Sequence, residues 1–213
     1  MPIRIVLADD HTMIRQGLKV ILEAEGFDVP GEAGNGVEAI ALCQRLRPDV
    51  AVLDISMPLL NGIDAAREIL KARPQTKIIL LTAHTQEHYV VQGLRQGVTG
   101  YILKENAADE LVHAVRAVAG GAIYVTAGVS RAVVQAFSRQ QQDSRERLSP
   151  RERHVLQLIA EGKSMKEIGA ILGVSSRTAD SHRTKIMNKL ALHDTANLVR
   201  YAISIGLIPP EKP

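Results

Sequence analysis

The sequence predicts two domains of different fold class: an α/β domain with a five-stranded, parallel, doubly wound sheet in residues 1–120, and a small all-α domain in residues 148–213. In the first, short β-branched runs alternate with longer helical patterns, as in five consecutive βα units. In the second, strand signals vanish and helix start and stop signals follow one another. Residues 121–147 are predicted to be a linker, in which residues 122–137 can form one short helix.

Five apolar runs predict the strands of the first domain. Residues 50–53 and 78–81 are apolar on both faces, which is typical of parallel strands covered by helices on each side. The runs are IRIVLA, DVPGEA, VAVLDI, KIILLT and GYILK. The first amphipathic helix is expected to start at Thr12 and to end at Gly26, with an apolar stripe facing the sheet. Its stripe is Ile14, Leu18, Ile21 and Leu22, and the side chains expected in solvent are Arg15, Lys19 and Glu23.

Helix start signals define the second domain. Ser149 is the predicted N-cap of its first helix, with Pro150 at the first helical position and Glu152 three residues after the cap. Two helices joined by a tight turn follow, and a last helix starts near Asp194. The residues expected to pack inward in the helix pair are Ile168, Ile171 and Leu172, and the last helix has the apolar stripe Leu198, Val199, Ala202 and Ile205.

Composition and charge narrow the classes of protein. No stretch approaches the roughly eighteen apolar residues of a membrane span, and acidic residues interrupt the N-terminal apolar run, so we expect a cytoplasmic protein. The single cysteine, Cys43, excludes an intramolecular disulfide and lies in the apolar pattern of a helix. Residues 1–120 hold 12 basic and 15 acidic residues, whereas residues 121–213 hold 14 and 8. The basic second half either meets a polyanion or has a solvated basic surface.

Polar residues end the predicted strands at one edge of the sheet, where open α/β folds bind their ligands. They are Asp9, Asp10, Asp54, Thr82 and Lys104. Converging carboxylates need a counterion, and hard oxygen ligands suit Mg²⁺. Singly, each residue has an ordinary explanation as a helix cap, a turn residue or a solvated charge. Together they form a constellation suited to phosphoryl transfer.

The segment VAVLDISMPLLNG resembles a response-regulator receiver domain of flavodoxin-like fold, and the resemblance covers about the first 120 residues. The matching positions in this segment are Asp54, Met57, Pro58, Asn61 and Gly62. One position departs from the pattern, because many receivers follow the lysine with proline and here Glu105 follows Lys104.

The resemblance implies a role for each residue of the acidic site. Asp54 accepts a phosphoryl group on its carboxylate. Asp10, Asp54 and the Ser56 carbonyl bind Mg²⁺ directly, and Asp9 acts chiefly through a water. A carboxylate is a weak nucleophile toward phosphorus, so Mg²⁺ and the Lys104 ammonium must neutralise the phosphoryl oxygens. Thr82 then hydrogen-bonds the product.

The resemblance also implies a switch that involves Tyr101, three residues before Lys104. Once the phosphoryl group arrives, Thr82 moves toward it and Tyr101 rotates from solvent into the space that Thr82 leaves. One face of the domain then changes shape. The alternative is that Tyr101 is a half-buried strand residue with no part in transmission.

The segment LSPRERHVLQLIAEGKSMKEIGAILGVSSRTADSHRTKIMNKL resembles a LuxR-type helix-turn-helix domain, and joined to a receiver it indicates the NarL/FixJ subfamily. Gly173 makes the turn, Val174 fills the angle, and Ser175 or Ser176 caps the next helix. The resemblance makes residues 176–190 the recognition helix, with its N-terminal part in the major groove of DNA. The candidates for DNA contact are Arg177, Thr178, Asp180, Ser181, His182, Arg183, Thr184 and Lys185.

The helical period sorts these candidates. A polar face is formed by Arg177, Asp180, Ser181 and Thr184, and the residues nearer the core are Ala179, Ile186 and Leu190. Thr178 and Lys185 suit phosphate contacts, whereas Arg177 and Arg183 either read guanine or neutralise phosphates. Relatives often have lysine where this chain has Asp180. Its carboxylate either accepts from a cytosine amino group or is a solvated helix charge.

These predictions combine into a phosphorylation-controlled transcription factor. A partner histidine kinase is expected to phosphorylate Asp54, and the altered receiver then controls binding of the helical domain to double-stranded promoter DNA. The resemblance suggests that part of the last helix pairs two DNA-binding domains, and a two-fold homodimer would need half-sites about ten base pairs apart. The cognate kinase, the operator, the direction of regulation and the resting oligomeric state stay open.

Two other functions compete with this prediction. A Mg²⁺-dependent phosphatase that passes through phospho-Asp would use Asp54 and Lys104 too, but it needs a second acid where this chain has Ser56. The sequence also lacks a substrate-pocket signature, so we expect no enzyme. A DNA-binding protein whose receiver has lost phosphorylation would need a broken acidic site, and the key residues are all present.

Overall fold

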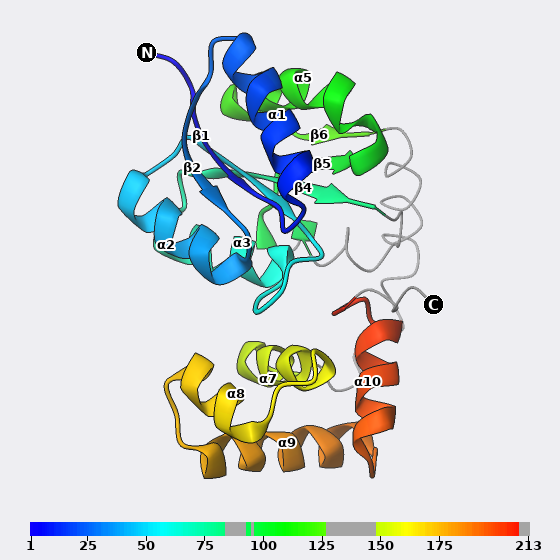
Figure 1. The fold of residues 1–213 in the computed structure, drawn as a ribbon. Helices are drawn as coiled ribbons and strands as arrows, with labels where there is room; N and C mark the ends of the chain where they lie inside the picture. The colour runs from blue at the N-terminus through cyan, green and yellow to red at the C-terminus, as the bar shows by residue number, and fades with distance from the viewer. Residues whose placement is uncertain (84–92, 95, 127–147, 209–213) are drawn as a thin grey trace. The chain divides into compact units, whose positions relative to one another are not determined.

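The structure is a computed structural model that describes residues 1–83, 93–94, 96–126 and 148–208. The chain divides into two compact units, Met1–Gln141 and Gln142–Pro213, and each is described by itself. Figure 1 shows a sheet with helices on both faces in the first unit and helices alone in the second. Among the described residues, no helix is long and apolar enough to span a bilayer.

The first unit is a parallel sheet with the strand order β2-β1-β3-β4-β5-β6. Its strands are β1 (Arg4–Ala8), β2 (Asp28–Ala33), β3 (Val50–Asp54), β4 (Lys77–Thr82), β5 (Gly100–Leu103) and β6 (Tyr124–Val125). Its helices are α1 (Thr12–Ala24), α2 (Gly36–Leu46), α3 (Gly62–Ala72) and α5 (Ala107–Ala119), with a 3-10 helix at Lys104–Asn106. The predicted doubly wound α/β fold is confirmed.

The sheet has six strands, and the prediction of five was wrong. The extra strand, β6, lies at the start of the range in which a short helix was considered, and it pairs in parallel with β5. Thr126 follows it and donates to the Tyr101 carbonyl from both its backbone N–H and its hydroxyl, each at 3.0 Å. A strand of two residues shows no apolar alternation, so periodicity could not reveal it. The part of that predicted helix from residue 127 lies outside the described residues.

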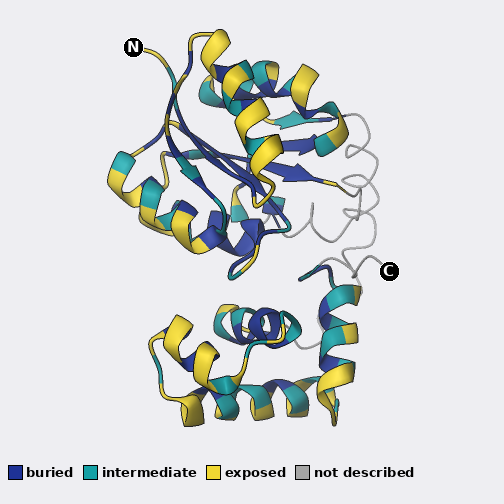
Figure 2. Ribbon diagram, viewed as in Figure 1, coloured by how far each residue is buried: buried dark blue, intermediate teal, exposed yellow. Residues whose placement is uncertain are grey.

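Successive strand residues pack into two hydrophobic layers. Figure 2 colours the central strands as buried over most of their length. One layer joins Val6, Leu53, Leu80 and Tyr101 to α2 and α3, and the other joins Ile5, Val52, Ile79 and Ile102 to α1 and α5. Nearly all these strand side chains are fully buried, as double cover by helices requires. Cys43 lies in the first layer, as its apolar pattern predicted.

The solvent face of α1 is partly different from the prediction. Leu18 and Leu22 are buried, but Ile14 at the start of the helix is 38% exposed. Arg15 and Lys19 are not simply solvated, because both pair with Glu32 on β2, at 3.4 and 2.8 Å. Helical periodicity identifies the apolar stripe but not how much of it the neighbouring element covers.

The second unit consists of α7 (Pro150–Ala160), α8 (Met165–Leu172), α9 (Ser176–Leu190) and α10 (Thr195–Ser204). Ser149 caps α7 in a reciprocal capping box with Glu152, as predicted, and Asp194 caps α10. Ser175, and not Ser176, caps α9. Ile171 was expected inside, but it is 37% exposed, whereas Ile168 and Leu172 are buried.

A close approach of backbone shapes the turn between α8 and α9. A Cβ on Gly169 would lie 2.8 Å from the Val174 carbonyl oxygen, so only glycine fits there without a shift. Gly173 has a φ of +66°, the left-handed conformation that ends α8. Ala179 and Ile186 of α9 are buried against the other helices, and Arg177, Ser181 and Thr184 are exposed. The structure therefore has the predicted helix-turn-helix, with a polar face on α9.

Candidate functional site

Three charged side chains meet at the carboxyl ends of β1, β3 and β5. Asp9, Asp54 and Lys104 continue the alternation of the strand residues that face α1 and α5, so the pleat points all three to the same side. The strand order reverses between β1 and β3, and such a switch point is where open α/β sheets bind ligands.

Lys104 joins the two buried aspartates. Its Nζ lies 2.8 Å from Asp9 Oδ2 and 2.8 Å from Asp54 Oδ2. The Asp9 and Asp54 side chains are 0% and 1% exposed. β4 lies between β3 and β5, and β3 and β4 both lie between β1 and β5, so the long lysine side chain reaches across the sheet edge to its partners. The arrangement thus holds two carboxylates against one ammonium in the interior.

These contacts change the acidity of both partners. Burial raises the pKa of Asp54 to about 6, even though the Lys104 ammonium and the Ser56 backbone N–H act in the opposite direction, and the neighbouring Asp9 adds to the rise. Burial alone would lower the pKa of Lys104, but Asp54 and Asp9 outweigh it and raise that pKa. Lys104 therefore stays charged. Its ammonium compensates only part of the desolvation of Asp54, so ionisation of Asp54 costs free energy.

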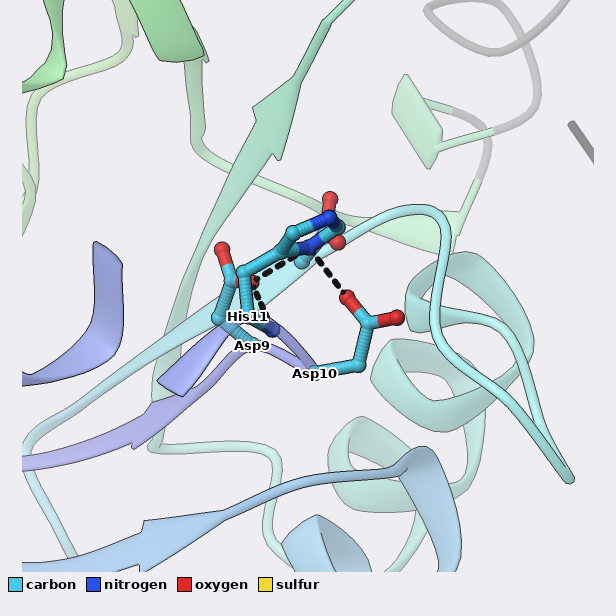
Figure 3. A group of neighbouring side chains, drawn as sticks. Asp9, Asp10 and His11 are labelled. Carbon is cyan, nitrogen blue, oxygen red and sulfur yellow. Dashed lines mark hydrogen bonds and ion pairs between the residues drawn. The ribbon is translucent and has the colours of Figure 1, made fainter. Parts of the chain in front are cut away.

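Asp10 and His11 complete the cluster (Figure 3). His11 Nδ1 lies 2.7 Å from Asp10 Oδ1 and 3.4 Å from Asp9 Oδ1, and the His11 N–H donates to Asp9 Oδ1 at 2.8 Å. Candidate ligand atoms of Asp9, Asp10, His11 and Asp54 all lie within 4.8 Å of one another. The carboxylate-rich donor set fits a hard divalent cation. Sequence analysis missed His11, although its position directly after the acidic pair was a usable signal.

The loop after β3 folds back onto the strand. Asn61 caps α3 by accepting from the Asp64 N–H at 2.9 Å, and the Gly62 N–H donates to the Ile55 carbonyl at 2.9 Å. A Cβ on Gly62 would overlap the Asp54 carbonyl. Asn61 and Gly62, two of the positions that match the receiver pattern, therefore fix the backbone next to Asp54.

Thr82 and Tyr101 lie on the other face of the sheet. Thr82, at the end of β4, is 3% exposed, and Tyr101 is fully buried among residues of the α2–α3 layer. Alternation along β4 and β5 puts both side chains on that same face. The ring lies against Gly93, where a Cβ would overlap the Tyr101 hydroxyl. Tyr101 is thus an interior residue in this structure.

The candidate DNA-contacting residues all lie on α9. The exposed members are Arg177, Thr178, Ser181, Thr184 and Lys185, and the half-buried members are Asp180, His182 and Arg183. Ser181 and Thr184 donate their hydroxyl protons to helix carbonyls four residues back, at 3.0 and 3.1 Å. Their oxygens can therefore accept from a base or from water. Asp180 Oδ1 pairs with Arg183 Nη2 at 2.9 Å, which sequence analysis did not anticipate.

Comparison with known families matches both units. The model described as "Response regulator receiver domain" matches residues 5–116, and the model described as "Bacterial regulatory proteins, luxR family" matches residues 146–202. The first covers the acidic cluster and nearly all of strands β1 to β5, and the second covers the helix-turn-helix. The chain belongs to the response regulators that join a receiver to a LuxR-type DNA-binding domain, and it is a DNA-binding transcriptional regulator of two-component type.

Individual relatives agree over almost the whole length. The chain is 37% identical over 207 residues to the transcriptional regulatory protein MctR of Rhizobium johnstonii, covering 97% of this chain and 95% of that one. It is 39% identical over 215 residues to the oxygen regulatory protein NreC of Staphylococcus epidermidis, covering 96% and 99%. Among solved structures, RcsB of Salmonella enterica serovar Typhimurium, bound to promoter P1flhDC with the phosphomimetic BeF3−, matches with a TM-score of 0.64, 29% identity and coverage of 96% and 100%.

Proposed function

We propose that Asp54 accepts a phosphoryl group from a sensor histidine kinase, and that this phosphorylation controls promoter binding by the LuxR-type domain. The observation that carries the proposal is the bridge from Lys104 to both Asp9 and Asp54 at the switch point of the sheet. The helix-turn-helix in the same chain gives the signal its output. The ligand is chromosomal DNA, so the proposed place of action is the cytoplasm. The proposed reaction is transfer of the phosphoryl group to Asp54 as a regulatory modification. Enzymatic turnover of external substrates is not part of the proposal.

Each residue of the cluster has a proposed task. The Asp54 carboxylate attacks phosphorus and displaces the kinase histidine as its P–N bond breaks, and the Lys104 ammonium neutralises a phosphoryl oxygen as the group arrives. Thr82 donates a hydrogen bond to the phosphoryl group once it is on Asp54. Asp9, Asp10, Asp54 and the Ser56 carbonyl would hold Mg²⁺, which supplies positive charge to the transferring oxygens when bound.

Transmission is proposed to run through the α2–α3 face of the sheet. Thr82 moves toward the phosphoryl group, and the buried position of the Tyr101 ring is the one that this movement favours. The solvent-facing position expected from the resemblance is then the alternative state. The common face of Thr82 and Tyr101 supports this coupling.

For the output, α9 is proposed to enter the major groove with its N-terminal part, in a homodimer on double-stranded promoter DNA. The exposed residues of its polar face support this placement, as does the solved RcsB relative bound to a promoter. Part of α10 is proposed to pair the two DNA-binding domains, where Val199 and Ile205 remain half-buried. The proposed boundaries are residues 1–120 for the receiver, 121–147 for the linker and 148–213 for the DNA-binding domain, with the first residues of the linker forming β6 in the receiver sheet.

The test is DNA binding by fluorescence anisotropy on promoter fragments from the chain's own genome. We expect wild type to gain affinity when beryllofluoride and Mg²⁺ are added, and Asp54→Asn to gain none. The matched control is Asp109→Asn, which alters an exposed carboxylate of the same unit outside the cluster and should retain the gain. Equal affinity in all states of the wild type would contradict phosphorylation control, while leaving DNA binding itself in place.

A further inference from the structure

The recognition helix contains one internal ion pair, between Asp180 and Arg183. Arg183 Nη2 lies 2.9 Å from Asp180 Oδ1, and the two side chains are 37% and 49% exposed. Within the described part of the chain, Arg183 Nε is buried without a hydrogen-bond partner. The Nε atom is thus turned away from solvent, while the Arg183 side chain as a whole stays partly exposed.

The helix geometry directs this pair toward the expected groove. Side chains on a helix lean toward its N-terminus, so Arg183 carries its guanidinium back over the turn that contains Asp180. Arg183 starts at the flank of α9, close to the buried Ala179, whereas Asp180 lies nearer the polar face with Thr184. The carboxylate therefore draws the guanidinium from the flank of the helix toward the N-terminal part of that face.

The pair differs in charge from the other basic groups of the helix. Among the residues that the structure describes, Arg177 and Lys185 have no ion-pair partner, so each offers a full positive charge to a phosphate. Asp180 cancels the charge of Arg183 at short range. A neutralised guanidinium gains little from phosphates, but it retains donors for a base edge.

We infer that Asp180 is a positioning residue, which holds Arg183 for reading a guanine and keeps it from acting as a sequence-independent phosphate contact. A guanidinium has five N–H donors, and one carboxylate oxygen uses one of them. Because Nε is buried, the donors left for DNA are on Nη1 and Nη2, and one proton from each can be given to the O6 and N7 acceptors of guanine. The inference rests on the proposed role of α9 in the major groove, and it replaces the two sequence-based interpretations of Asp180, a direct cytosine contact and a solvated charge.

The experiment measures base preference with the full chain. Wild type, Asp180→Ala, Arg183→Lys and the double variant are bound to an operator library randomised at each base pair, with beryllofluoride and Mg²⁺. Arg183→Lys keeps the charge and the apolar stem but removes the fork. We expect both single variants to lose discrimination at the same guanine-containing base pair, on the order of tenfold. The double variant should lose little more than either single variant, because the two residues act as one unit.

Binding to unrelated DNA is a second readout, and it distinguishes a positioning role of Asp180 from that of a solvated charge. Asp180→Ala frees Arg183, so binding to unrelated DNA should become tighter and its salt dependence steeper by about one released counterion. Lys185→Ala is the control, because loss of a phosphate contact should weaken binding to all sequences equally and leave base preference unchanged. Both residues of the pair are partly exposed, and thermal unfolding of each variant checks that the fold is intact.

Several outcomes would overturn the inference. Loss of preference at a different base pair in each single variant would mean that Asp180 and Arg183 read two bases independently. Unchanged base preference in Asp180→Ala would mean that Asp180 is only a solvated charge. Loss of the same base preference in both single variants, with binding independent of Asp54, would support the inference and overturn only phosphorylation control. A wild type without any base preference would overturn both the inference and the DNA-reading part of the proposed function.

Discussion

The folded receiver destabilises the ionised form of the Asp54 side chain. Its carboxylate is buried, and its pKa of about 6 shows that desolvation and the nearby Asp9 outweigh the attraction of Lys104. A cation that approaches this cluster meets incompletely compensated negative charge. The same imbalance that destabilises the ionised side chain therefore favours a metal ion or a charge-neutralising modification.

Replacement of Asp54 should stabilise the receiver in a pH-dependent way. The folded pKa of about 6 lies above the ordinary value of 3.8, so ionisation costs stability, and that cost appears as pH rises from the lower value to the higher one. Asp54→Asn should raise the free energy of unfolding by on the order of 1–3 kcal/mol near pH 7 without Mg²⁺, and by much less near pH 4. Urea unfolding of both proteins at the two pH values measures this difference.

The exposed Asp109→Asn is the control for that measurement, since it removes a carboxylate from the surface of the same unit. It should show no comparable gain near neutral pH. A gain for Asp54→Asn that is equal at both pH values would contradict the link to ionisation.

Gly93 offers a direct test of the position of Tyr101. A Cβ at Gly93 would overlap the Tyr101 hydroxyl and lie 3.2 Å from Leu80 Cδ1, so Gly93→Ala should drive the ring from its buried site. We expect a loss of roughly 1–3 kcal/mol of stability, and loss of most of the affinity gained with beryllofluoride. Thermal unfolding and DNA anisotropy measure the two effects.

Gly17→Ala is the matched control for this substitution. Gly17 lies within α1, and a Cβ there has nothing within 4 Å. Alanine should therefore stabilise the helix by about 0.5–1 kcal/mol and leave the response to beryllofluoride unchanged. A full response in Gly93→Ala would show that the buried ring has no part in transmission.

At the scale of single helices, α7 depends on the capping box of Ser149 and Glu152. Glu152 also accepts from Lys189 of α9 at 2.8 Å, so it joins the first helix of the domain to the recognition helix. Burial would raise the pKa of Glu152, but the Lys189 ammonium and the Ser149 donors outweigh it and lower that pKa. This carboxylate therefore stabilises the domain above the ordinary pKa of 4.5, and the contribution is lost as pH falls through the folded value.

Lys189→Met should make this domain less stable at neutral pH and less sensitive to acid below the ordinary pKa of Glu152. Methionine keeps the apolar stem of the side chain and removes only the charge, and the expected loss is about 1 kcal/mol. Melting temperatures between neutral and acidic pH measure the change. Lys166→Met, an exposed lysine of α8, is the control. A parallel shift at every pH would contradict the coupling to Glu152.

Local chemistry explains why some elements could be predicted from the sequence and others could not. The cap at Ser149 and the bounds of α9 were predictable, because a hydroxyl followed by glutamate and a glycine turn act over a few residues. The convergence of Asp9, Asp54 and Lys104 was predictable too, since parallel strands end at one edge. The exposure of Ile14 and Ile171 and the strand β6 depend on which neighbours fold against them, whereas the ion pair of Asp180 and Arg183 is an i, i+3 contact that helical spacing could have indicated. Periodicity contains no information about such neighbours.

At the scale of the whole molecule, the two compact units should respond separately to their ligands. Beryllofluoride with Mg²⁺ at about 100 times its dissociation constant should stabilise the receiver by about 2.7 kcal/mol. The thermal transition of residues 148–213 should not move. Calorimetry with and without the additive measures both transitions, and Asp54→Asn should abolish the shift. A joint shift of both transitions would show that the units unfold as one.

The hydrogen bonding of β5 limits the motion by which the proposed signal could pass Tyr101. The Tyr101 backbone pairs with Leu80 of β4 on one side and with Val125 of β6 on the other. The Tyr101 carbonyl accepts two hydrogen bonds from Thr126. Strand displacement would break bonds at both edges at once, so rotation of the side chain is the available motion. Rotation of a fully buried ring needs the packing around it to loosen, including its contact with Gly93. In the proposed transmission, the time that the signal needs to pass is therefore set by how readily this packing opens.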